Sequence, residues 1–95
     1  MKILTATQLY QPGGVPHLSL TCTSKEPAEL GDVFILYYYA DIKFTVISMT
    51  ANKDEYIYTL EEEGSAFGDD PLTIEELRDF LGLRFHAWRR SGTYA

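Results

Sequence analysis

Hydrophobic and polar residues alternate along much of the first 62 positions, a pattern typical of strands half-buried in a sheet. The clearest example is the segment 17–23, in which Leu18, Leu20 and Cys22 share one face and polar residues occupy the other. A weaker alternation predicts another strand over residues 2–10.

Two more alternating runs, at residues 42–50 and 55–62, flank the short polar segment 51–54. Asparagine and aspartate in that segment tolerate turn geometry. We therefore predict a β-hairpin with a four-residue loop.

The run Val-Phe-Ile-Leu-Tyr-Tyr-Tyr-Ala at residues 33–40 is apolar on both faces. Such a run predicts a central strand that is covered on both sides. Because the run is too short for its period to be decisive, a buried helix over residues 27–41 is the alternative. The segments 11–16, 24–32 and 64–68 are rich in glycine, proline and polar residues and are predicted to be loops.

A helix signal begins after residue 72. Thr73 fits an N-cap and Glu76 stands three positions later, which is the capping-box pattern, while Leu72 and Leu77 fit a hydrophobic staple. Apolar residues then recur with helical periodicity through Trp88, so we predict one amphipathic helix to about residue 90, ended at residue 92 by glycine.

Together these elements predict an α+β fold in a single domain over residues 1–95. An antiparallel sheet of four to five strands should carry one C-terminal amphipathic helix packed on it. A chain of 95 residues with 45% hydrophobic content is large enough to bury one modest core.

The composition excludes several classes of function. The longest uncharged run is far too short to span a bilayer, and a lone cysteine cannot form an internal disulfide, so we expect a cytoplasmic protein without membrane contact. The two histidines and the cysteine lack metal-ligand spacing, and the glycine-rich segment 11–16 lacks the lysine of a phosphate-binding loop. We expect no metal, no cofactor and no catalytic residue.

Three residue groups have both a structural and a functional interpretation. Cys22 is interpreted as a buried, inert thiol, and the tyrosines at 37–39, 56 and 58 as core and sheet-surface residues rather than a base-stacking platform. His86 with Asp79 forms a weak candidate dyad on the polar helix face. Arg84 lies in the apolar arc of the predicted helix, where it either stacks on Trp88 or marks the rim of an interface.

Charge is distributed unevenly along the chain. The net charge of −6 divides into zero over residues 1–53, −9 over residues 54–79 and +3 over residues 80–95. If the hairpin and the helix start lie together, the carboxylates share one edge of the molecule, and such a row can imitate the phosphates of a nucleic acid. The predicted partner-binding residues are Asp54, Glu55, Glu61, Glu62, Glu63, Asp69, Asp70 and Arg84.

These features predict a non-enzymatic, protein-binding inhibitor. Its acidic edge would occupy a basic, nucleic-acid-binding surface of a partner protein, without direct nucleic-acid binding. The profile is similar to that of many phage-encoded proteins that block a host enzyme or defence complex, a likeness of composition that covers no motif. A monomer or homodimer is expected; a self-associating assembly subunit is the second hypothesis, and a small enzyme subunit the third.

Overall fold

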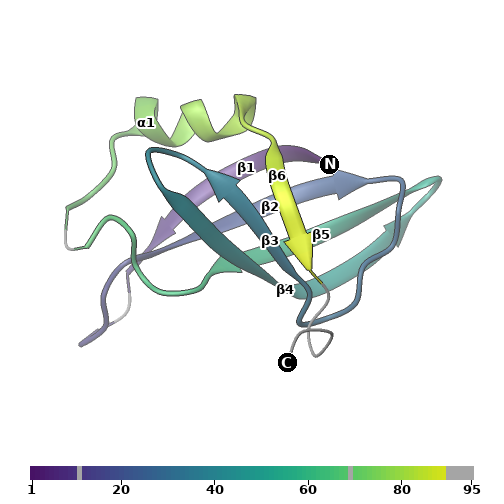
Figure 1. The fold of residues 1–95 in the computed structure, drawn as a ribbon, viewed down its shortest axis with the longest axis horizontal. Coiled ribbons are helices and arrows are strands. Elements are labelled where there is room, and N and C mark those ends of the chain that lie inside the picture. The colour runs from purple at the N-terminus through teal and green to yellow at the C-terminus, as the bar shows by residue number, and fades with distance from the viewer. Residues whose placement is uncertain (11, 69, 90–95) are drawn as a thin grey trace.

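The computed structural model describes residues 1–10, 12–68 and 70–89. In this part of the chain, six antiparallel strands form one sheet in the order β1-β2-β5-β4-β3-β6 (Figure 1). The α+β class is confirmed, with more strands than the predicted four to five. The elements are β1 (Lys2–Leu9), β2 (His17–Ser24), β3 (Val33–Tyr37), β4 (Asp41–Asn52), β5 (Glu55–Glu62), the helix α1 (Ile74–Asp79), the 3₁₀ turn η1 (Phe80–Gly82) and β6 (Phe85–Arg89).

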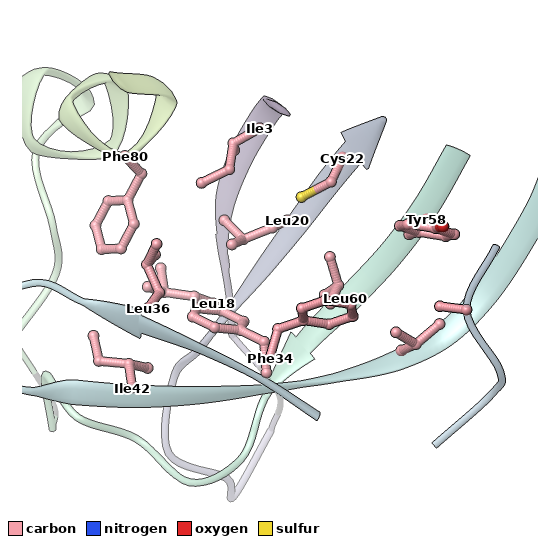
Figure 2. Close-up of a cluster of buried hydrophobic side chains, with 13 residues drawn as sticks. Ile3, Leu18, Leu20, Cys22, Phe34, Leu36, Ile42, Tyr58, Leu60 and Phe80 are labelled. Atoms are coloured by element: carbon pink, nitrogen blue, oxygen red, sulfur yellow. The ribbon is translucent and has the colours of Figure 1, made fainter. Parts of the chain in front are cut away.

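The sheet folds over on itself, so that β1, β2 and β5 face β3, β4 and β6 across a shared interior (Figure 1). Apolar side chains from both layers meet there, and Phe80 enters from η1 (Figure 2). The alternation in the sequence decides which residues point inward. Buried members of this core are Ile3, Leu18, Leu20, Cys22, Ala28, Phe34, Leu36, Ile42, Phe44, Val46, Tyr58, Leu60 and Phe80.

The hairpin formed by β4 and β5 is longer than predicted. Asn52 pairs with Glu55, so only Lys53 and Asp54 remain to close the turn. Lys53 adopts a left-handed backbone with φ 57°, which lets two residues reverse the chain. The predicted four-residue loop is therefore wrong, although the hairpin itself is confirmed.

β3 is shorter than the predicted strand and is covered mainly on one face. Phe34 and Leu36 point into the core, whereas Tyr37 is 60% exposed. Residues 38–40 form the turn to β4, closed by a bond from the Tyr38 N–H to the carbonyl of Ala40 at 3.0 Å. The alternative of a buried helix over residues 27–41 is wrong, and so is full cover on both sides.

The start of α1 agrees with the prediction, but its length does not. Thr73 and Glu76 form the capping box, with hydrogen bonds of 3.1 and 3.2 Å between each backbone N–H and the other side chain. The helix nevertheless ends at Asp79, and residues 85–89 form β6 instead of further helical turns. The predicted stop at residue 92 lies outside the described residues.

Residues 85–89 pair with the edge of β3, which explains why their helical periodicity did not predict the structure that they form. As a strand, β6 places Phe85 and Trp88 beside Phe34, with ring centroids 5.5 and 5.8 Å apart. A glycine at position 82 weakens any helix that would continue through it by about 1 kcal/mol. None of the helices in the described ranges is long and apolar enough to cross a membrane.

Candidate functional site

The antiparallel strand order decides which charged segments meet. β3 and β5 end, and β4 begins, at the same end of the sheet, on the left in Figure 1. We call this the helix-side end and define it by residues 37–41, 61–63 and 70–79. The β4–β5 turn, residues 52–55, forms the opposite, turn-side end.

Glu63 and Asp41 present exposed carboxylates at the helix-side end. The N–H of Glu63 donates to the carbonyl of Lys43 at 2.8 Å, which holds the residue beside the start of β4. Glu61 is less exposed, and one of its oxygens lies 3.9 Å from Nε2 of His17. Two of the three consecutive glutamates therefore remain available at the surface.

Glu62 is the third of these glutamates, and it is buried, with only 7% of its surface exposed. One carboxylate oxygen accepts the N–H of Leu18 at 3.0 Å, and the other accepts the N–H of Ala66 at 2.7 Å. Its charge thus joins β2 to the segment after β5 and cannot meet a partner. The alternation of β5 indicates this burial, since residue 62 follows Tyr58 and Leu60 on the inward face.

Gln8 secures the linker between β5 and α1, a role that sequence reasoning missed. Its side-chain oxygen accepts the N–H of Leu72 and the hydroxyl of Tyr10, both at 2.8 Å, and its amide donates to the carbonyl of Asp70 at 3.4 Å. The hydroxyl of Ser65 also donates to the carbonyl of Pro16. These bonds fix the backbone that carries Asp70; the predicted site residue at position 69 lies outside the described residues.

The β3–β4 turn adds aromatic rings to the same end. Tyr38 packs against Phe80, with ring centroids 4.5 Å apart, which anchors the turn. Its neighbours point outward, so that Tyr37 is 60% and Tyr39 86% exposed. Tyr39 has φ 61°, a left-handed conformation that is unfavourable for a side chain of this size.

The carboxylates of α1 lie close to this turn. Burial raises the pKa of Tyr38 above its usual value of 10.0, and the neighbouring Tyr39, Asp79 and Glu76 raise it further. The helix-side end therefore combines carboxylates with exposed phenols.

Asp54 and Glu55 do not belong to this surface. They lie at the turn-side end. Glu55 is six positions before Glu61 on β5, a separation of about 20 Å at roughly 3.3 Å per residue. The single acidic edge expected from the sequence is therefore divided between two ends of the molecule.

The other two candidate residues, Arg84 and His86, lie in surroundings that differ from those predicted. Arg84 is exposed in the connection before β6 rather than in a helical arc. Because β6 lies on β3, Nε2 of His86 sits 3.1 Å from Oδ1 of Asp41 instead of pairing with Asp79. Both partners are exposed, as in an ordinary surface pair.

The inert interpretation of Cys22 is confirmed. The residue is fully buried, and burial raises the pKa of its thiol to about 12, which keeps the group protonated and unreactive near neutral pH. Within the described ranges, no three His, Cys, Asp or Glu side chains are grouped closely enough to hold a metal ion.

Comparison with known proteins gives no relative for this chain: no protein-family model, no curated protein and no solved structure matches it.

Proposed function

We propose that this protein is a non-enzymatic binding module whose helix-side end docks on a basic surface of a partner protein. The partner surface is one that otherwise binds nucleic acid, so that docking inhibits the partner. The observation that carries the proposal is the convergence of carboxylates and exposed tyrosines from segments far apart in sequence. The acidic residues concerned are Asp41, Glu61, Glu63, Asp70, Glu75, Glu76 and Asp79.

The chemistry of this surface suits lysine and arginine side chains. Carboxylates attract them over a distance and steer association, and tyrosine rings accept a cation on their faces. Arg78 is the basic residue of these segments, and Lys43 lies next to Glu63, so negative charge predominates there.

The conformation of Tyr39 supports a role in contact. Glycine or asparagine would occupy the left-handed turn position with less strain, yet the chain places there a ring that is 86% exposed. Tyrosine is enriched among the residues that dominate binding energy at protein interfaces. The ring packs edge-on against Tyr38, with centroids 4.8 Å apart, and a contact role gives a reason for its exposure.

The experiment is affinity capture from host lysate at low salt, followed by elution with increasing salt. A matched pair of variants accompanies the natural protein: Glu63→Lys with Asp70→Lys at the helix-side end, and Asp54→Lys with Glu55→Lys at the turn-side end. We expect salt-sensitive capture that the first pair abolishes and the second pair retains, because surface charge attraction is screened by salt.

Equal loss in both double variants would mean that only total charge matters. Capture insensitive to salt and to the helix-side substitutions would contradict the proposal. Displacement of nucleic acid from the captured partner tests the inhibitory part, since the natural protein should compete with the nucleic acid for one surface.

A further inference from the structure

A hollow of about 390 Å³ lies along β6, apart from the helix-side surface. Phe34, Tyr58, Phe85 and Trp88 supply its aromatic lining. Met1 and four residues that end or follow β2, Ser24, Glu26, Pro27 and Ala28, line it as well. Its volume is within the range of ligand-binding cavities, and its shape follows a strand.

β6 is the last strand of the sheet. It pairs with β3 on one side, and no strand among the described residues pairs with its other side. An unpaired edge offers backbone N–H and C=O groups to any extended chain. Because four consecutive residues of β6, 85–88, line the hollow, this backbone edge borders it directly.

Trp88 is unusual for such an edge. Soluble proteins commonly protect free edges with lysine or proline, whereas here the indole is 54% exposed beside Phe34. Tryptophan in a hollow with a polar rim is typical of an anchor residue at a binding surface.

Opposite charges mark the two ends of the hollow. Arg84 precedes the first residue of β6, while Glu26 follows the end of β2, which pairs with the start of β5 toward the turn-side end. The register confirms this direction, since Leu36 pairs with Phe85 and Val33 pairs with the last residue of β6. A bound chain would therefore meet positive charge at one end and negative charge at the other.

We propose that β6 binds an extended peptide segment of another protein, added antiparallel to the edge of the sheet. An apolar side chain of the peptide enters the aromatic hollow. A basic residue on its N-terminal side meets Glu26, and an acidic residue on its C-terminal side meets Arg84. Backbone pairing gives the affinity, and the alternate side chains give the specificity.

The walls of the hollow favour a peptide over a second copy of this chain. Met1 and residues of the segment after β2 line the hollow together with β6. A second copy joined through β6 would bring its own Met1 and its own segment 24–28 into the same region. Steric crowding of these segments opposes a continuous sheet between two copies.

The test uses synthetic peptides and the single tryptophan of the chain, Trp88, as the reporter. The probe is the blocked heptapeptide Thr-Lys-Thr-Leu-Thr-Glu-Thr, whose lysine, leucine and glutamate share one face of a strand. A control peptide exchanges lysine and glutamate. We expect the probe to shift Trp88 emission to shorter wavelength, with saturation below about 1 mM, an affinity of the order accessible to a short strand.

Charge reversal tests the direction of binding. Arg84→Glu should weaken binding of the probe by about threefold to tenfold, because the reversal removes one exposed ion pair and adds a repulsion, and it should improve binding of the control peptide. Arg78→Glu, on α1, is the matched control and should leave both affinities unchanged. Because Arg84 is exposed, Arg84→Glu should fold normally, so a change in affinity reports on binding.

Three results would overturn the inference. The first is no emission shift at about 1 mM probe. The second is equal affinity for both peptides in the natural protein and in Arg84→Glu. The third is a dimer in sedimentation that Trp88→Arg dissociates, which would assign the β6 edge to self-association. The helix-side charge reversals do not touch this site, so its failure and that of the proposed function are distinguishable.

Discussion

Phe80 beneath the helix-side end and Trp88 along β6 are aromatic residues with opposite exposure. Beneath the helix-side end, Phe80 and Tyr38 fill the interior and fix the surface above them, while the polar clamp of Gln8 and Glu62 holds the linker. Along β6, Trp88 leaves an aromatic surface open beside an unpaired backbone. The comparison teaches that Phe80 contributes to stability, whereas Trp88 remains available for contact, as Tyr37 and Tyr39 do at the helix-side end.

The largest expected difference comes from removing one aromatic ring from each region. Phe80→Ala should lower the free energy of unfolding by about 3–5 kcal/mol, because it removes a fully buried ring between Tyr38 and Phe67. Trp88→Ala should lower it by less than about 1.5 kcal/mol, since half of that ring is already in water. Urea denaturation of both variants measures the difference, and equal losses would contradict the contrast.

A second comparison separates two neighbouring glutamates. Glu62→Gln should destabilise the protein by about 2–3 kcal/mol, because the new amide nitrogen cannot accept one of the two buried N–H groups and the charge is lost. Because Glu63 is exposed, Glu63→Gln should change the free energy of unfolding by no more than about 0.5 kcal/mol. If the two substitutions changed the free energy of unfolding equally, the buried, hydrogen-bonded position of Glu62 would be contradicted.

The two left-handed turn residues give the smallest and most selective effect. Tyr39→Gly and Lys53→Gly should each raise the free energy of unfolding by about 0.5–1 kcal/mol, because glycine adopts positive φ without strain. Only Tyr39→Gly should also weaken partner binding, since Lys53 lies at the turn-side end. If Tyr39→Gly bound the partner as well as the natural protein does, Tyr39 would not be part of the interface.

Much of the fold follows from residue patterns that act locally. Period-two alternation identifies β1, β2, β4 and β5, and the capping box identifies the first turn of α1. Buried Glu62 is also readable in principle, because it continues the inward face of β5. These features depend on neighbours in sequence.

The failures arise where distant contacts decide the local structure. Residues 85–89 have the spacing of an amphipathic helix, but the edge of β3 offers hydrogen bonds and the ring of Phe34, and the segment becomes β6. The prediction of a single acidic edge failed for the same reason. Strand direction places Glu61 and Glu63 beside the start of β4 and carries Asp54 and Glu55 to the far end, which no local pattern reveals.

The most direct measurement of the docking face is site-specific photo-crosslinking to a captured partner. A photo-reactive phenylalanine derivative replaces Tyr39 in one variant and Asp54 in another, both at exposed turn positions. The proposed docking mode predicts crosslinks from position 39 and none from position 54. Crosslinks from position 54 alone would contradict it and place the partner at the turn-side end.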